Sequence, residues 1–324
     1  MATITYREAL NQALREEMRR DPDVFIMGED VGVFEGAYKV TVGLLAEFGE
    51  KRVRDTPIAE LAIIGLGVGA AMTGLRPVCE LMTVNFSLLA MDQIVNHAAK
   101  IHYMFGGRVK VPLVIRMPEG GGFQLAATHS QTFDSWFGYV PGLRVVSPAF
   151  PADAKGMLKS AIRCDDPVIF LENEALYNTR GEVPEGEYLE PLETAAVRRN
   201  GTDVTLIANS RMTLVALEAA RRLEEEGIDA EVIDLRCIRP LDRETLVQSV
   251  RKTNRAVTVE EGWRSFGWGA EVAASLSEQA FDYLDAPIGR VGGAEVPMPY
   301  ARNLEKEAIP DADDVIAAVR RLYK

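Results

Sequence analysis

Cysteine and histidine are scarce in this sequence. The three cysteines, Cys79, Cys164 and Cys237, lie far apart and outside any CxxC spacing, which excludes a zinc site or a disulfide framework built from them. Such cysteine usage is typical of a reducing compartment, and we expect a cytoplasmic protein. Two of the three histidines, His97 and His102, are five residues apart and so lack the i, i+4 spacing of helical metal ligands.

Long apolar runs and blocks of basic residues are also missing. The longest uncharged apolar run, residues 61–75, contains four glycines and is 15 residues long, whereas a membrane span needs about 20. Lysine and arginine total 36 against 48 acidic residues, so the net charge is −12. These features argue against a membrane protein and against a nucleic-acid-binding protein.

What is present is the composition of a globular protein, with 47% hydrophobic and 26% charged residues. A chain of 324 residues exceeds the size at which single cores stop growing, so we expect two domains. The segment 178–191 mixes proline, glycine and charge without periodicity, as linkers do. We therefore predict domains at 1–185 and 186–324.

Both halves alternate strand-like apolar runs with helical stretches, a pattern that favours parallel sheets covered by helices, the α/β class. The amino terminus reads as an amphipathic helix. The stretch 86–104 predicts one long packed helix that Gly106 and Gly107 end. The strands expected in the two halves are 24–28, 76–82, 111–116 and 166–172, then 204–209, 230–235 and 256–261. Helices are expected in the second half at 212–226, from a cap at Asp242 to about 252, and at 268–279.

One carboxylate lies at the start of an apolar, glycine-rich helix, where DTPIAE runs into LAIIGLGVGAAMTG. Burial there would raise the pKa of Glu60 and let it share a proton with a neutral heterocyclic nitrogen. The alternative is an ordinary acid at a helix start, which the helix dipole favours. The same helix contains GxGxxA, but we expect close helix packing through Gly65 and Gly69 and no dinucleotide site, since a clear preceding strand is lacking.

The third histidine, His129, follows the glycines of 120–122 and is expected in an exposed loop. A loop histidine can change its charge near neutral pH. A surface or structural role is the alternative.

Several motifs resemble, in order and spacing, those of the β subunits of thiamin-diphosphate-dependent 2-oxo acid dehydrogenases. They extend over essentially the whole chain. The motifs are GEDVG from Gly28, GAYKV from Gly36, DTPIAE from Asp55, MTVNFSLLAMDQIVNHAAK from Met82, HSQ from His129, VPGLRVVSP from Val140, PADAKGMLKSAIR from Pro151, DPVIFLENEALY from Asp166, IRPLD from Ile238 and VPMPYA from Val296.

The resemblance implies a first domain that binds the aminopyrimidine half of thiamin diphosphate and a second like the carboxy-terminal domain of transketolases. It implies that Glu60 hydrogen-bonds the aminopyrimidine ring nitrogen and promotes its imino tautomer. Met82 and Phe86 match positions that pack on the pyrimidine. Glu29 in GEDVG is a candidate for supporting the site, and an ordinary acid at the end of a strand is the alternative. His129 matches a histidine implicated in stabilising intermediates and in acyl transfer to lipoamide.

Some relatives bind potassium through backbone carbonyls. At two of the five matching positions the side chain differs from the family's usual one, because Cys164 and Asp166 stand where Asp and Asn are usual. The matching carbonyls belong to Leu113, Ala161, Ile162, Cys164 and Asp166. The GDG motif through which the family holds magnesium and the diphosphate is missing from the sequence. The resemblance thus implies an α subunit that holds magnesium, an α2β2 heterotetramer, and docking to a lipoyl-bearing acyltransferase core.

We expect oxidative decarboxylation of pyruvate with transfer of the acetyl group to lipoamide, because GAYKV and FLENEALY favour pyruvate. Within the family, an acetoin or branched-chain 2-oxo acid dehydrogenase β subunit is the alternative. Outside it, the alternatives are a self-contained transketolase-like synthase, which would need a diphosphate domain ahead of residue 1, and a nucleotide-binding dehydrogenase or scaffold based on residues 65–70.

Overall fold

The structure, a computed structural model, describes residues 1–323, and these form two compact units. The first comprises residues 1–119 and 136–192, and the second comprises residues 120–135 and the described residues from 193 onward. The segment 120–135, which the sequence analysis assigned to the first domain, thus packs with the second unit. Both units consist mostly of parallel strands and covering helices, so the α/β class is confirmed.

A parallel sheet forms the centre of the first unit, with its strands in the order β6-β7-β5-β4-β2-β3. The inner strands β2 and β7 are buried along nearly their whole length, as expected for a sheet that helices cover on both faces, whereas the edge strand β3 exposes Arg54 and Asp55. The strands are β2 (Val24–Gly28), β3 (Val53–Asp55), β4 (Arg76–Glu80), β5 (Val114–Glu119), β6 (Arg144–Val146) and β7 (Val168–Asn173). A small antiparallel pair adds β1 (Ala2–Thr5) and β8 (Arg180–Val183).

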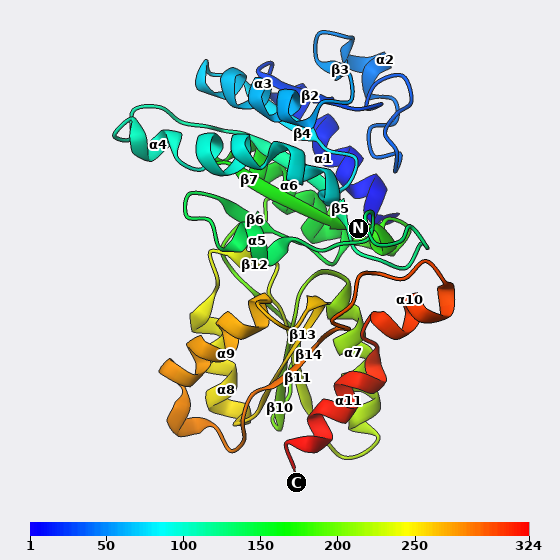
Figure 1. Ribbon diagram of the computed structural model, residues 1–324, viewed down its shortest axis with the longest axis vertical. Helices are drawn as coiled ribbons and strands as arrows, with labels where there is room; N and C mark the ends of the chain where they lie inside the picture. The colour runs from blue at the N-terminus through cyan, green and yellow to red at the C-terminus, as the bar shows by residue number, and fades with distance from the viewer. Residues whose placement is uncertain (324) are drawn as a thin grey trace. The chain divides into compact units, whose positions relative to one another are not determined.

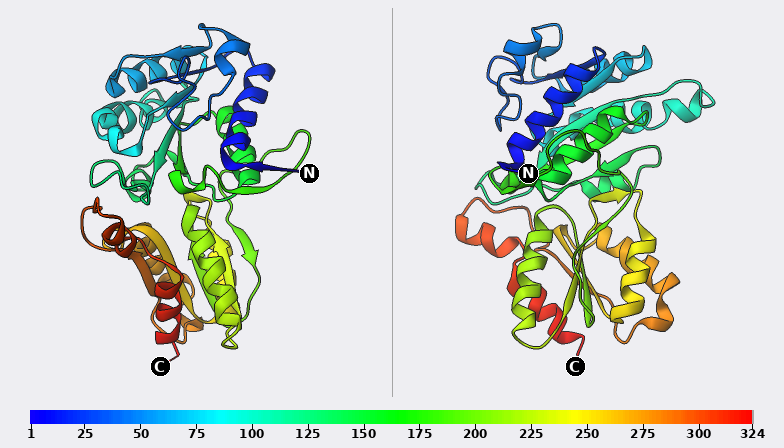
Figure 2. Two further views of the ribbon diagram at one scale, coloured as in Figure 1. Left: turned by 90° about the vertical axis from the view of Figure 1, so that its right-hand side faces the viewer. Right: turned by 180° about the vertical axis from the view of Figure 1, so that it is seen from behind.

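Helices cover both faces of this sheet. The helices α1 (Tyr6–Arg20) and α6 (Pro151–Arg163) pack together on the face seen from behind in Figure 2, while α3 (Glu60–Met72) covers the other face (Figure 1). A capping box between Thr5 and Glu8 starts α1. The remaining helical segments are α2 (Leu44–Phe48), η1 (Val84–Ala90), η2 (Gln93–Ala98), α4 (Ile101–Met104), α5 (Asp134–Gly138) and η3 (Glu174–Leu176).

The prediction of a single long helix over residues 86–104 was wrong. The chain instead forms the 3₁₀ helix η1, the π-helix η2 and the short α-helix α4. The close helix packing expected at two glycines also differs. A Cβ at Gly67 would lie 2.6 Å from Cys79 Sγ and one at Gly65 would lie 3.4 Å from Gln93, whereas Gly69 has no described atom within 4 Å.

The second unit has a five-stranded sheet in the order β14-β13-β10-β11-β9, in which only the edge strand β9 runs antiparallel. Figure 1 shows α8 and α9 on one side of this sheet and α7 and α11 on the other. Its strands are β9 (Ala196–Arg199), β10 (Val204–Ala208), β11 (Ala230–Asp234), β13 (Ala256–Trp263) and β14 (Gly289–Gly293), and β12 (Cys237–Arg239) is a further short strand. Its helices are α7 (Ser210–Glu224), α8 (Arg243–Thr253), α9 (Trp268–Gln279), η4 (Phe281–Tyr283), α10 (Arg302–Ala308) and α11 (Ala312–Arg321).

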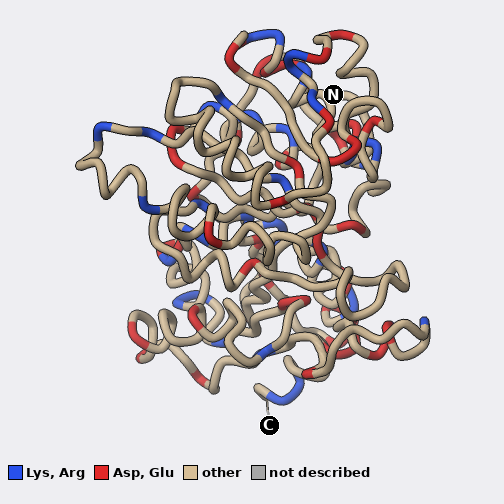
Figure 3. The backbone as a smooth tube through the Cα atoms, turned by 45° about the horizontal axis from the view of Figure 1, so that its top comes forward, with Lys and Arg blue, Asp and Glu red and all other residues tan. Residues whose placement is uncertain are grey.

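The predicted helix start at Asp242 is confirmed, because its carboxylate accepts the Thr245 N–H at 3.1 Å. Acidic and basic residues are scattered over both units of the chain (Figure 3). Within residues 1–323, no helix is both long and apolar enough to cross a membrane.

Candidate functional site

The carboxyl edge of the first unit's sheet collects acidic and apolar side chains from three neighbouring strands. Because β3, β2 and β4 are adjacent and parallel, their carboxyl ends meet at one edge. Glu29 directly follows β2, Glu60 follows β3 by five residues, and Met82 follows β4 by two. Ligands of open α/β sheets bind at such carboxyl edges.

Glu60 is the first residue of α3 and is only 4% exposed. The preceding residue, Ala59, occupies the N-cap position and supplies no side-chain hydrogen bond to the helix. The Glu60 carboxyl therefore lies near the positive end of the helix dipole, the arrangement expected of an acid that begins a helix. Glu60 can thus both begin the helix and take part in a ligand site.

Glu29 lies close enough to Glu60 for their charges to interact. Burial raises the pKa of Glu29, and the negative charges of Glu60 and Asp30 raise it further. The Oε1 atom of Glu29 is buried and has no hydrogen-bond partner within residues 1–323. A buried acceptor without a donor is costly, so this oxygen is suited to a donor from a ligand.

Asp55, at the end of β3, connects the segments that carry the two glutamates. Its carboxylate accepts the N–H of Gly32 at 2.6 Å and the N–H of Val33 at 3.0 Å, both in the segment that follows Glu29. Asp55 itself lies five residues before Glu60. Sequence reasoning did not give Asp55 this role, because it expected no strand at residues 53–55, where Asp55 is the last residue of β3.

Met82 and Phe86 follow β4 and are both half-buried. Phe86 belongs to η1, which packs against α3, the helix that begins at Glu60. The structure therefore places partly exposed apolar side chains and two buried acids on elements that meet at one sheet edge.

A buried ion pair network lies in the same unit, in the strands β4, β5 and β7. Arg116, 1% exposed, donates to Glu172 from Nε and Nη2, both at 2.7 Å, and from Nη1 to Glu80 Oε2 at 2.5 Å. Tyr177 donates its hydroxyl to Glu172 at 2.8 Å. Two carboxylates on one guanidinium leave no uncompensated positive charge, and the network ties the three strands together beside the sheet edge.

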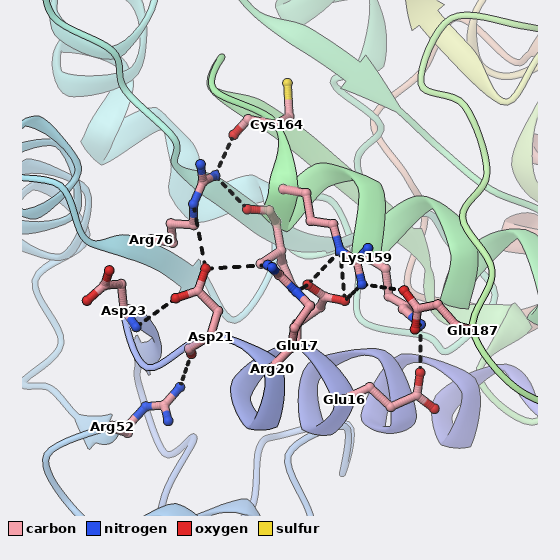
Figure 4. Close-up of polar contacts among 12 residues, drawn as sticks. Glu16, Glu17, Arg20, Asp21, Asp23, Arg52, Arg76, Lys159, Cys164 and Glu187 are labelled. Atoms are coloured by element: carbon pink, nitrogen blue, oxygen red, sulfur yellow. Dashed lines mark hydrogen bonds and ion pairs between the residues drawn. The ribbon is translucent and has the colours of Figure 1, made fainter.

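The carbonyl groups suggested for potassium already accept hydrogen bonds from the protein at four of the five positions. Leu113 and Ala161 accept backbone N–H groups, and Arg76 Nη1 donates to Ile162 O at 3.0 Å and Cys164 O at 3.1 Å (Figure 4). Two of the carbonyls therefore already face a positive charge of the chain. Potassium binding there stays a prediction, and no part of the proposed function uses it.

His129 belongs to the second unit, in the loop 120–131. Its side chain is half-buried, and its Nδ1 lies 3.0 Å from Thr128 Oγ1. The His129 N–H donates to Ala126 O at 3.3 Å. The expectation of a loop position is confirmed.

Comparisons with known proteins match both units to families. Residues 2–180 match the transketolase pyrimidine binding domain, and residues 193–315 match the transketolase C-terminal domain. A solved structure described as a split-gene transketolase, an inactive β4 tetramer, superposes with a TM-score of 0.82 at 29% identity and covers 98% of both chains.

Several curated proteins similar to this chain are β subunits of the pyruvate dehydrogenase E1 component. The pyruvate dehydrogenase E1 component subunit beta of Rhizobium meliloti is 54% identical and covers 100% of this chain and 71% of its own length. That of Rickettsia felis is 53% identical over 98% of both chains. The mitochondrial protein of Bos taurus is 52% identical over 98% of this chain and 90% of its own length.

These identities extend over nearly the whole chain, and the paired transketolase domains agree with the fold. The chain therefore belongs to the family of pyruvate dehydrogenase E1 β subunits, a thiamin-diphosphate-dependent family.

Proposed function

We propose that the carboxyl edge of the first unit's sheet binds the aminopyrimidine half of thiamin diphosphate, with Glu60 as the residue that hydrogen-bonds the ring nitrogen. The observation that carries this proposal is the pair of buried acids, Glu60 at a helix start and Glu29 with an unpartnered Oε1. An aminopyrimidine offers an amino donor and a ring nitrogen, which match one free acceptor and one carboxyl.

Glu60 holds and exchanges a proton in this proposal. Glu29 and Glu60 are both buried and interact electrostatically, and burial, followed by the negative charge of Glu60, raises the pKa of Glu29. A carboxyl group that carries a proton can donate it to a ring nitrogen.

Met82 and Phe86 supply the apolar surface for the flat face of the ring. Both are half-buried, so each keeps exposed side-chain surface that a ring could cover. When bound, the cofactor supplies the carbanion that attacks the keto carbon and the ring that takes up the electrons as carbon dioxide leaves. The protein's part is to orient the ring and to control its protons.

His129 has a separate role in the proposal, in transfer of the acetyl group from the cofactor to lipoamide. A half-buried imidazole in a loop can donate a proton to a thiolate or an oxygen as charge develops. Pyruvate is the proposed substrate, and a lipoyl-bearing acyltransferase core is the proposed acceptor.

We propose further that an α subunit completes the site and holds magnesium and the diphosphate, in an α2β2 heterotetramer. Residues 1–323 contain no group of three or more His, Cys, Asp or Glu side chains arranged to hold a metal ion. Magnesium with a diphosphate requires oxygen ligands or a cationic cradle. A second support is an exposed apolar surface on α3.

That surface, the α3 face, consists of apolar side chains on a helix that is apolar all round. A helix of this kind is normally buried on every side. Its exposed members include Leu61 at 51%, Leu66 at 63% and Met72 at 39% exposure. The α3 face therefore fits contact with another subunit.

We place the assembly in the cytoplasm, where the buried Cys79 thiol stays reduced.

The test replaces Glu60 with glutamine in the enzyme assembled with its α subunit. We expect the rate of pyruvate decarboxylation to fall by about 10²-fold or more, the range that general acid–base groups contribute, with unchanged assembly by analytical ultracentrifugation. Glu244→Gln is the matched control, because Glu244 is also a first-turn helix acid but lies in the second unit. Unchanged turnover in Glu60→Gln would refute the assignment.

A further inference from the structure

The loop 120–131 that carries His129 is closed at its base and strained along its length. The Gly120 N–H donates to Gln131 O at 3.1 Å, so the two ends meet, as in an Ω-loop. Gln124 and Ala126 adopt φ values of 57° and 64°, a region that side chains other than glycine rarely occupy. Residues in such conformations persist only when surrounding contacts hold them.

Glu305, on α10, holds the first half of this loop. Its side chain is only 3% exposed, and its Oε1 accepts the backbone N–H of both Gly122 and Gln124 at 2.9 Å. Hydrogen bonds to an ionised acceptor are about twice as strong as neutral ones. One carboxylate oxygen from a distant part of the sequence thus fixes two peptides on either side of Phe123.

The peptide before these two is fixed as well. The Gly121 N–H donates to Glu261 Oε1 at 2.8 Å, and its carbonyl accepts from Arg211 Nη1 at 3.0 Å. A Cβ at Gly121 would lie 3.0 Å from Met298 Cε and 3.1 Å from Ile309 Cδ1, so no larger residue fits without a shift. The loop is therefore attached to the rest of the second unit at three places, residues 121, 122 and 124.

His129 contacts its own loop through Thr128 and Ala126, so the place of its imidazole follows the place of the loop. We propose that Glu305 is a positioning residue for His129: its carboxylate sets the loop conformation in which the imidazole serves acetyl transfer. This inference rests on the role proposed above for His129. In this proposal Glu305 acts through the loop, by its bonds to the Gly122 and Gln124 N–H groups.

The test compares variants in the enzyme assembled with its α subunit, using a free lipoyl domain as acetyl acceptor and, separately, a dye as electron acceptor. Glu305→Ala removes the acceptor of both N–H groups, whereas Glu305→Gln keeps a carbonyl oxygen at the same place. Glu307→Ala, an exposed acid on the same helix, is the matched control. His129→Ala defines what loss of the imidazole does to each rate.

We expect Glu305→Ala to lower acetyl transfer to the lipoyl domain by about tenfold or more, since small displacements of reacting groups cost up to about 10²-fold. Its two rates should follow the pattern of His129→Ala, Glu305→Gln should restore most of the loss, and Glu307→Ala should behave as wild type. Combining Glu305→Ala with His129→Ala should add no further loss, because both act through one group.

Three results would overturn the inference. The first is a double variant whose acetyl-transfer rate falls by the product of the two single losses, the second is an unchanged rate in Glu305→Ala, and the third is a Glu305→Gln variant as impaired as Glu305→Ala. Hydrogen exchange separates this from a failure of the proposed function. If His129→Ala leaves acetyl transfer unchanged, the role proposed for His129 is wrong. The positioning of the loop by Glu305 is then tested by the amide hydrogen exchange rates of Gly122 and Gln124. Faster exchange there in Glu305→Ala supports the positioning of the loop, and unchanged exchange contradicts it.

Discussion

Glu60 illustrates what single residues reveal in a sequence and what they do not. Its place at a helix start was predictable from the apolar run behind it, and physics alone favoured a simple capping acid. The resemblance of its motif to the family implied that Glu60 binds the cofactor. Neither source predicted that Glu29 would leave a buried oxygen without a partner, because that depends on where β2 and β3 end beside one another.

Arg116 gives a prediction for stability. Replacing it with methionine would leave the carboxyl groups of Glu80 and Glu172 buried without their shared cation. We expect the free energy of unfolding to fall by about 3–5 kcal/mol, as when one partner of a buried ion pair is removed. Denaturant unfolding of the isolated chain measures this loss. The exposed Arg221, which pairs with Glu218 and Glu225, is the control, and Arg221→Met should cost less than about 1 kcal/mol.

Glu260 gives a prediction for pH dependence. Burial, and then the charge of Asp134, raises the pKa of Glu260 to about 8, while the Gly269 N–H and Arg290 act against this. The folded chain therefore holds a proton that the unfolded chain releases above its ordinary pKa, so this group makes stability decline as pH rises from about 4.5 to about 8.

Replacing Glu260 with glutamine removes that proton uptake. Unfolding free energies of the wild type and Glu260→Gln should be similar near pH 5, and the variant should gain relative to the wild type as pH rises, by up to roughly 1.4 kcal/mol per pH unit. Unfolding curves at a series of pH values measure the difference. A constant difference between the two proteins from pH 5 to pH 8 would count against this account of Glu260.

At the scale of elements, the strand at 24–28 was predicted more accurately than the helical segment at 86–104, which contains Phe86 of the candidate site. The strand at 24–28 has the predicted bounds because a doubly covered strand is a short apolar run with clear ends. The segment 86–104 has helical periodicity too, but periodicity does not distinguish α from 3₁₀ or π turns. Such departures from the α-helix often occur at functional sites, and here η1 carries Phe86.

The helix α3 gives a prediction for assembly. Introducing a charge at the exposed Leu66 should leave the fold intact, since this side chain is 63% exposed, but should weaken binding to the α subunit by about tenfold or more. Titration of the two purified subunits, with unfolding curves of the Leu66→Glu chain, measures both effects. Leu189→Glu, at a position 46% exposed outside α3, is the control and should bind as wild type. Equal affinities for all three proteins would show that the α3 face is not the contact.

At the scale of the whole molecule, sequence periodicity predicted two α/β units, and the linker composition predicted a boundary between residues 185 and 186, whereas the two units divide between residues 192 and 193. It did not predict that residues 120–135 pack with the second unit. The bonds that fix this segment join it to Arg211, Glu261 and Glu305, residues about 90 to 180 positions away. Contacts over such separations have no local signature, so Glu305 could not be found from the sequence pattern.

The central claim is that this chain supplies only the pyrimidine-binding part of a shared active site. The most direct measurement is carbon dioxide release from pyruvate, with thiamin diphosphate and magnesium, by the isolated chain, by its α subunit, and by the two together. The account predicts no turnover by either subunit alone and full turnover by the mixture. Full-rate decarboxylation by the isolated chain would contradict it.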